Sequence, residues 1–208
     1  LKQGIAEKLY IEVVCRSGKD QAAAIISGSH THFVFAERND RVVLDERQPG
    51  GVEDADTDIQ LSMRMVYDFA TTAPLGEISF ILKTKEYNMR AAELSIKGNY
   101  GHCLGKTMDR PLSHGIFGNS IFSHIISRTA SACDARMGGA MIPVMSNSGS
   151  GNQGICATNP VAVYAMENEN TEEELVRALM LSHLTAIYIK QSLGKLSALC
   201  GCVVASIG

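Results

Sequence analysis

A run of small and polar residues is the part of the chain best suited to bind a charged ligand. Residues 146–155 read SNSGSGNQGI and hold three glycines, three serines and two asparagines between apolar segments. Successive backbone N–H groups of such a turn can converge on an anion, and a helix that begins just beyond would add its positive N-terminus. A tight loop between two buried helices, in which glycine lets backbones approach closely, explains the same composition. The sequence leaves both interpretations open.

The run does not match the common phosphate-binding motifs. No lysine follows it where a Walker A loop requires one, and it is not a GxGxxG turn after a strand. Its serine and asparagine side chains add neutral donors, which suit a carboxylate or a phosphate group.

A second candidate is a pair of charged residues in an otherwise small and apolar run. Asp134 and Arg136 lie within the helix-like segment 129–139. Charges that are buried must be satisfied, so such a pair can mark a site. A structural ion pair or an exposed helix end explains the pair as well, and we favour that explanation in the absence of other evidence.

The cysteines and histidines give weaker signals. Six cysteines are scattered along the chain, and no two pairs have the spacing of zinc ligands. Small buried thiols are the ordinary explanation, although one cysteine can supply a single ligand to a cluster whose other ligands lie elsewhere. His30 and His32 fall on one side of an expected strand, and His183 lies on the apolar face of an expected helix, where we expect a core histidine.

The elements that must position these residues change character along the chain. Short runs rich in Val, Ile and Phe, broken by turn residues, predict an antiparallel β-meander of three or four strands over 8–18, 21–28, 31–40 and 41–51. Apolar spacings of three and four predict helices over 57–74, 116–141 and 171–193, with a further helix after Gly194. The segment 75–101 is predicted as another helix or a broken pair of helices, ending at Gly98 or Gly101. Thr171 and Glu174 form a capping box.

These elements predict the fold class α+β. An α+β domain over 1–100 holds the N-terminal antiparallel β-meander with helices, and an all-α helical domain over 101–208 follows, truncated at its C-terminus.

Composition excludes some classes of partner. The chain has 208 residues, a formal net charge of −3 and no basic run, which argues against a nucleic-acid partner. No apolar stretch reaches the roughly 18 residues of a membrane span, so we expect no membrane partner. We expect a cytoplasmic protein with reduced thiols. Since the chain lacks an initiator Met and stops inside a small-residue apolar run, we also expect the central part of a longer protein.

Three segments together resemble a known family. They are RTASACDARMGGAMIPVMSNSGSGNQGICATNP, RALMLSHLTAIYIKQSLGKLSALCGC and the strand motif GSHTHFVF. They are similar to the L-cysteine desulfidase family, which is related to the iron–sulfur L-serine dehydratases, and the similarity runs along essentially the whole chain.

The resemblance implies a lyase that removes the β-substituent of an amino acid by α,β-elimination without pyridoxal phosphate. Cysteine desulfidase converts L-cysteine to pyruvate, ammonia and sulfide, and the dehydratases convert L-serine to pyruvate and ammonia. A [4Fe–4S] cluster acts as Lewis acid on the leaving group while a base removes the Cα proton. Such chemistry is physically coherent, because it stabilises developing charge at both ends of a reaction with a weakly acidic proton and a poor leaving group.

The resemblance carries over to particular residues. Cys200 corresponds to the one cluster ligand of the LSALC motif, and the remaining ligands and the catalytic base are expected outside this chain. Asp134 and Arg136 fall in the family's SDAR motif, with Cys133 where Ser is common, and Cys202 has no cluster role. The substrate-binding loop comprises Ser146, Asn147, Ser148, Gly149, Ser150, Gly151, Asn152, Gln153 and Gly154.

The fragment alone is therefore expected to hold no intact cluster and to be inactive. Its expected partner is a small amino acid substrate, and the oligomeric state stays open, a homo-oligomer included. The alternatives are L-serine dehydratase activity, a non-catalytic module that binds a small anion, and a purely structural helical protein. The last explains the Ser, Ala and Gly content but not the loop.

Overall fold

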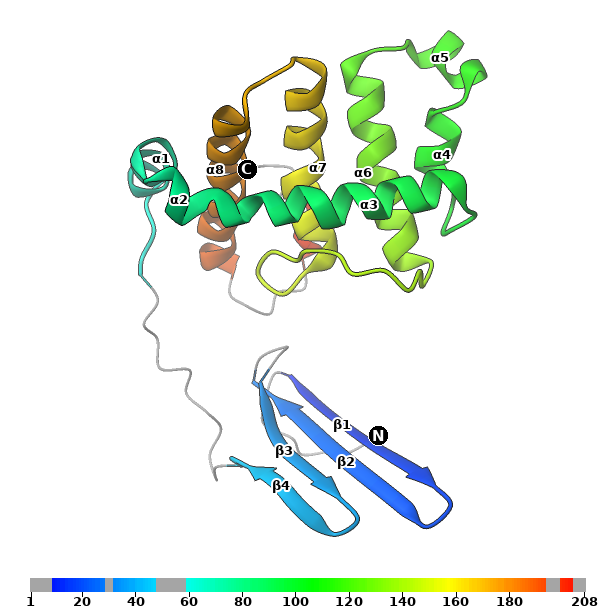
Figure 1. Ribbon diagram of the computed structural model, residues 1–208, viewed down its shortest axis with the longest axis vertical. Helices are drawn as coiled ribbons and strands as arrows, with labels where there is room; N and C mark the ends of the chain where they lie inside the picture. Colours follow the sequence, from blue (N-terminus) through cyan, green and yellow to red (C-terminus); the bar gives the residue numbers. More distant parts are fainter. Residues whose placement is uncertain (1–8, 29–31, 48–58, 194–198, 204–208) are drawn as a thin grey trace. The chain divides into compact units, whose positions relative to one another are not determined.

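The computed structural model describes residues 9–28, 32–47, 59–193 and 199–203 (Figure 1). The chain divides into two compact units, Leu1–Ile59 and Gln60–Gly208, which are described separately. The first contains a four-stranded antiparallel sheet and the second contains helices. The predicted α+β class, with an N-terminal meander and a helical region after it, is confirmed.

The sheet is a simple meander in which each strand pairs with the next along the chain. Its strands are β1 (Tyr10–Ser17), β2 (Asp20–Ser27), β3 (Phe33–Arg38) and β4 (Arg41–Asp45). Asn39 and Asp40 join β3 to β4 with φ of 48° and 61°, the left-handed conformation that a two-residue hairpin turn requires. Ile25, Val34 and Phe35 are buried together and form the core of this unit.

The helical unit begins with short helices and continues with long ones. Its elements are α1 (Met63–Thr72), α2 (Leu75–Ile78), the 3-10 turn η1 (Ser79–Ile81), α3 (Leu82–Lys97), α4 (Leu104–Met108), α5 (Pro111–Phe117), α6 (Ile121–Met137), α7 (Gly151–Glu167) and α8 (Glu172–Leu193). α6, α7 and α8 lie side by side, and α3 runs across α6 and α7 (Figure 1). Among the described helices, none combines the length and the apolar character that crossing a membrane requires.

The division between the units lies earlier than the sequence predicts. We predicted a boundary near residue 100, but α1, α2 and η1 pack on α8, and α3 packs on α6 and α7. Ala70 and Ile78 share one buried core with Val176 and Leu179. The helices before residue 100 therefore belong to the helical unit, because their apolar faces are buried against helices that come much later in the chain.

Small residues bring α3, α6 and α7 close together. Ala91 and Ala92 of α3 are fully buried against Ala132 and Ala135 of α6 and Ile155 of α7. Small side chains at a helix contact allow a short distance between the axes. This packing fixes the N-terminal end of α7 beside the C-terminal end of α6.

The predicted capping box at the start of α8 is confirmed. The backbone N–H of Thr171 donates to Glu174 Oε2 at 2.8 Å, and the backbone N–H of Glu174 donates to Thr171 Oγ1 at 3.3 Å. These two bonds satisfy backbone donors that the helix itself leaves free.

Candidate functional site

The Ser/Gly-rich run forms a hairpin turn that leads directly into α7. The N–H groups of Asn147 and Ser150 donate to each other's carbonyl oxygens, at 3.1 and 2.9 Å. Ser148 and Gly149 between them have φ of 47° and 78°, as in a type I′ turn. Ser150 is the N-cap of α7, and its side chain accepts from the N–H of Gln153 at 3.2 Å. The run is therefore half turn and half first helical turn.

The turn is pressed against the helix that follows it. A Cβ atom on Gly154 would lie 2.1 Å from the carbonyl oxygen of Met145, so only glycine fits. Asn88 of α3 fixes the same place: its Oδ1 accepts from the N–H of Met145 at 2.8 Å, and its Nδ2 donates to the carbonyl of Gly154 at 3.2 Å. The tight-loop explanation of the composition is thus correct for this part of the run.

A buried polar network holds the turn to α8. Asn147 Nδ2 donates to the carbonyl of His183 at 3.0 Å and lies 3.1 Å from His183 Nδ1, while Asn147 Oδ1 accepts from Gln153 Nε2 at 2.8 Å. Both amide protons of Asn147 are therefore used within the protein. We predicted Asn147 as a substrate-binding residue, and in the structure its contacts position the loop.

The network also assigns the proton of the buried imidazole. Because Asn147 Nδ2 donates, His183 Nδ1 must accept, so the proton is on Nε2, which lies 2.9 Å from Thr158 Oγ1. Thr158 in turn donates to the carbonyl of Gly154 at 2.7 Å. Burial lowers the pKa of His183 to about 4. The expected core histidine is confirmed, and it is neutral at physiological pH.

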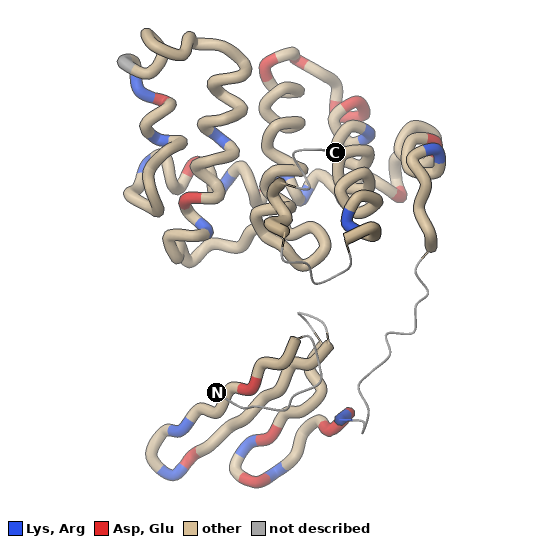
Figure 2. The backbone as a smooth tube through the Cα atoms, turned by 180° about the vertical axis from the view of Figure 1, so that it is seen from behind, with Lys and Arg blue, Asp and Glu red and all other residues tan. Residues whose placement is uncertain are grey.

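Arg136 lies at the N-terminal end of α7. Its Nη1 donates to Asn152 Oδ1 at 3.2 Å, and a Cβ on Gly151 would lie 2.2 Å from its Nε. The side chain of Arg136 is exposed and has no acidic partner among the described residues. No charged residue occurs over 137–166, so that part of the backbone is tan throughout in Figure 2. A cation and a helix N-terminus together favour an anion at this place.

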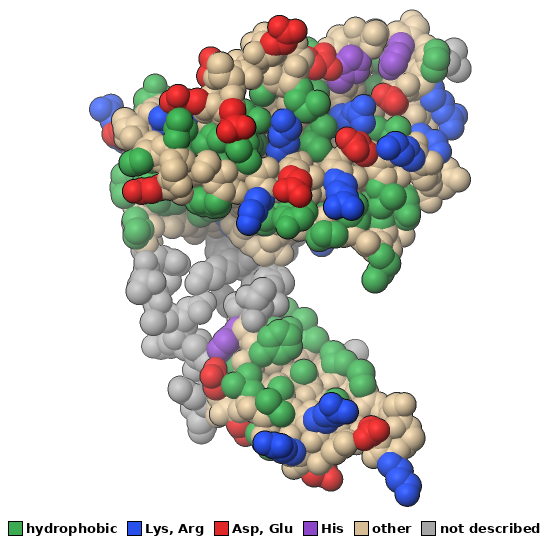
Figure 3. All heavy atoms as spheres, viewed as in Figure 1, with side chains coloured by type: hydrophobic (Ala, Val, Ile, Leu, Met, Phe, Trp, Pro, Cys, Tyr) green, Lys and Arg blue, Asp and Glu red, His purple; other side chains and the backbone are tan. Residues whose placement is uncertain are grey.

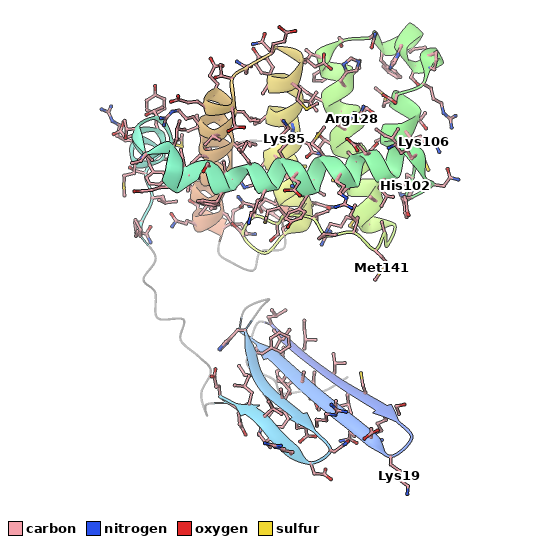
Figure 4. All side chains as sticks on the ribbon, viewed as in Figure 1. Lys19, Lys85, His102, Lys106, Arg128 and Met141 are labelled. Atoms are coloured by element: carbon pink, nitrogen blue, oxygen red, sulfur yellow. The ribbon has the colours of Figure 1, made fainter. Side chains whose placement is uncertain are left out.

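The side chain of Asp134 points away from Arg136, toward the turn before α4. Its Oδ1 accepts from the backbone N–H of His102 at 2.9 Å, and it packs against Gly101 and Gly138. His102 lies at the α4 end of the helical unit (Figure 4). Residues two apart on a helix point about 200° apart, which is why Asp134 and Arg136 do not form the ion pair that we considered. Asp134 thus positions the turn before α4.

Four cysteines contact one another in succession, and one of them, Cys133, lies near Arg136; the amino-acid sequence did not reveal this group. Cys133 of α6 and Cys156 of α7 share a hydrogen bond between their thiols, and Cys156 also bonds Cys202. Cys200 Sγ lies 3.0 Å from Cys202 Sγ. Arg136 of α6 bonds Asn152 of α7. Cys133 lies one helical turn before Arg136, and Cys156 lies one helical turn after Asn152, so the two thiols form the next contact along the same pair of helices. In the sequence, only these spacings of one helical turn could have indicated that Cys133 and Cys156 meet.

The contacts between the thiols shift their pKa values in opposite directions. The hydrogen bond with Cys202 lowers the pKa of the exposed Cys200, and the same bond, together with burial, raises the pKa of Cys202 to about 11. The hydrogen bond with Cys156 lowers the pKa of Cys133, and that bond and burial raise the pKa of Cys156.

Gly201 brings the Cys200–Cys202 segment onto the start of α7. A Cβ on Gly201 would lie 2.6 Å from Gln153 Oε1 and 2.8 Å from Ser150 Oγ. The side chain of Gln153 is fully buried, and its Oε1 has no donor among the described residues. The first turn of α7 thus combines an unpaired acceptor with a nearby guanidinium and a nearby thiol.

A complete metal site is not found in the described part of the chain, where no three His, Cys, Asp or Glu side chains are arranged to hold an ion. Cys200 is exposed and can serve as one ligand. His30 lies outside the described residues, and His32 Nδ1 contacts the carbonyl of Ser27 at 3.2 Å.

Charges of both signs are mixed over the face of the helical unit that Figure 3 shows. That face presents no continuous basic surface of the kind that binds nucleic acid.

Comparisons with known proteins give one family and several close relatives. The family model described as serine dehydratase alpha chain matches residues 11–208. The chain is 63% identical over all its residues to a UPF0597 protein of Bacteroides fragilis and 62% identical to a UPF0597 protein of Bacteroides thetaiotaomicron. A UPF0597 protein of Vibrio parahaemolyticus is 45% identical over 96% of the chain.

The chain spans about half the length of these curated relatives, namely 49%, 48% and 48% in the order given. No solved structure matches it.

Proposed function

The chain belongs to the serine dehydratase alpha chain family, and from that premise we propose that it is the central part of an iron–sulfur-dependent amino acid lyase. The proposed reaction is the α,β-elimination of L-cysteine to pyruvate, ammonia and sulfide. L-serine, with water as the leaving group, is the alternative substrate.

The observation that carries the proposal is the guanidinium of Arg136 at the start of α7. An amino acid substrate brings a carboxylate, and a guanidinium next to free N–H groups of a helix N-terminus binds a carboxylate with charge-assisted hydrogen bonds. Arg136 contacts Asn152 and packs on Gly151. We therefore assign the carboxylate to Arg136 and the first turn of α7.

The other polar end of the substrate is its ammonium group, which needs an acceptor. Gln153 Oε1 is a buried acceptor without a donor, next to Gly201. A buried polar atom left unpaired is costly, so a ligand that supplies a donor gains affinity there. We assign the ammonium group to Gln153 Oε1.

The β-substituent of a substrate held in this way is directed toward the cysteines. The residue proposed to bind the [4Fe–4S] cluster is Cys200, with its remaining ligands outside this chain, because the described residues include no set of three ligands. When bound, such a cluster supplies a Lewis acid for the leaving thiolate or hydroxyl group. We place the base that removes the Cα proton outside the chain as well.

The proposal is tested with substitutions of Arg136 in the full-length, anaerobically reconstituted enzyme. Arg136→Met removes a charged hydrogen-bond partner of about 1.5–3 kcal/mol, so KM for L-cysteine should rise roughly 10- to 100-fold. Arg136→Lys should recover part of this loss, because it keeps the charge without the planar fork. Pyruvate and sulfide release are measured with both amino acids.

The matched control is Arg90→Met, which removes an exposed arginine from α3 and should leave KM unchanged. Equal KM values for the Arg136→Met variant and the parent enzyme would remove Arg136 from the site.

A second candidate function is a non-catalytic module that binds a small carboxylate. The same Arg136 contact supports it, because an anion site needs no catalytic base. Saturable binding of L-cysteine or L-serine by the full-length protein, without release of pyruvate, would favour this module over the lyase.

A further inference from the structure

Two of the gathered thiols are close enough to react with each other. Cys200 Sγ and Cys202 Sγ lie 3.0 Å apart, and a disulfide bond is about 2.05 Å long, so a small movement joins them. Cys200 is exposed, while Cys202 is partly covered and also contacts Cys156. An oxidant in solution therefore reaches Cys200 first and finds a second thiol beside it.

The other cysteines offer contrasting surroundings. Cys15 is exposed but lies in the sheet unit, and Cys103 Sγ contacts the carbonyl of Tyr100 at 3.4 Å. Among the described residues of the sheet unit, Cys15 is the one cysteine, and it serves as an internal comparison.

We propose that Cys200 and Cys202 form a redox modification site, in which a hydroperoxide converts the two thiols to a disulfide. The sulfur of Cys200 attacks one oxygen of hydrogen peroxide, the O–O bond breaks, and a first water leaves, which produces a sulfenic acid. The sulfur of Cys202 then attacks the sulfur of Cys200, the S–O bond breaks, and the proton of Cys202 departs with a second water. In total, one hydrogen peroxide is reduced to two waters and two thiols are oxidised to one disulfide.

The modification has a consequence for cluster binding, and that consequence rests on the proposed function. A cysteine in a disulfide has no thiolate to offer a metal. If Cys200 binds the cluster, the oxidised chain cannot use it, and the site takes up iron only after a thiol reductant has opened the bond. The disulfide chemistry itself does not depend on the reaction that the enzyme catalyses.

The experiment uses the reduced 208-residue chain and one equivalent of hydrogen peroxide. After alkylation of the remaining thiols and tryptic digestion, the peptide that begins at residue 196 carries both cysteines. We expect this peptide to lack two hydrogens, to escape alkylation and to regain both thiols with dithiothreitol. Cys202→Ser should abolish the disulfide and leave Cys200 as a sulfenic or higher acid.

Cys15→Ser is the control and should leave the disulfide yield unchanged. Full alkylation of Cys200 and Cys202 after peroxide, or a disulfide that instead joins Cys133 to Cys156, would overturn the proposal. Failure of the proposed function would appear differently, as absence of pyruvate release from the reduced full-length enzyme.

Discussion

His183 shows how the environment of one side chain decides its chemistry. Its Nδ1 accepts from Asn147 and its Nε2 bonds Thr158, so both nitrogens are satisfied in the neutral form. If Nδ1 were also protonated, its N–H would face the N–H donor of Asn147, and a charged imidazolium would be buried. Both effects would cost free energy. The imidazole therefore serves as a rigid support for the turn at Asn147.

Folding stability should fall with acidification through His183. Burial lowers its pKa to about 4 in the folded state, whereas the unfolded value is about 6.5. Between these values the unfolded chain binds more protons, so the contribution is fully present above pH 6.5 and is lost as the pH falls to 4. The linkage is on the order of 3 kcal/mol.

Urea unfolding measured from pH 7 to pH 4.5 tests this prediction. His183→Gln should show a flatter dependence of the unfolding free energy on pH than the parent chain. His102→Gln, at an exposed position, should keep the parent slope. Parallel curves for His183→Gln and the parent chain would contradict the assignment.

At the scale of elements, three features meet at the start of α7. They are a hairpin turn, a capped helix end and a close packing contact. Asn147 to Ser150 close the turn, and Ser150 caps the helix. Because Gly154 has no side chain, the backbone of Met145 and Ser146 can lie directly on the helix. The side chain of Asn88, in α3, bonds both the backbone of Met145 before the turn and the backbone of Gly154 in the helix. The turn and the start of α7 are therefore held against each other by contacts from α3 and from the turn itself.

Gly154→Ala should destabilise the helical unit and move this end of α7. Its new Cβ would lie 2.1 Å from the carbonyl oxygen of Met145, which is backbone and cannot rotate away. Overpacking of this kind costs roughly 1–3 kcal/mol or more. The free energy of unfolding in urea measures the loss.

Gly115→Ala is the matched control, because a Cβ there meets nothing within 4 Å and the residue lies inside α5. It should be neutral or stabilising by up to about 1 kcal/mol. Equal stability of the Gly154→Ala variant and the parent chain would show that the turn is not pressed against α7.

At the scale of the whole molecule, we propose that the chain contributes one part of a larger site. It spans about half the length of its curated relatives, and in our proposal its described residues supply the substrate-binding side of the site, with Cys200 at its edge. The sheet and the helices form separate units, and every residue that we assign to the site belongs to the helical unit.

The 208-residue chain alone should therefore not hold a stoichiometric [4Fe–4S] cluster. Four thiols are gathered, but no three ligands in the described residues are arranged for a metal ion. Iron and acid-labile sulfide are measured after anaerobic reconstitution, with the full-length protein as the positive control. Four irons and four sulfides per 208-residue chain would contradict the prediction.

Local patterns in the sequence determined the elements of this protein. Alternating residues and turn signals predicted a meander of three or four strands, and the spacing of apolar residues predicted the helices around α1, α3, α6 and α8 but not α7. The capping box at Thr171 was also visible, because it depends on residues three positions apart. A helix was considered just beyond the Ser/Gly-rich run, whereas α7 begins inside the run, at Gly151.

Only the tertiary structure decided which of these elements share a core and which side chains meet. The helices before residue 100 join α6–α8, Asn147 is bonded to His183, and Cys133, Cys156 and Cys202 come together from three segments. Asp134 and Arg136, two residues apart, separate to different surroundings. Contacts between distant segments depend on how whole helix faces pack, and no short stretch of sequence contains that information.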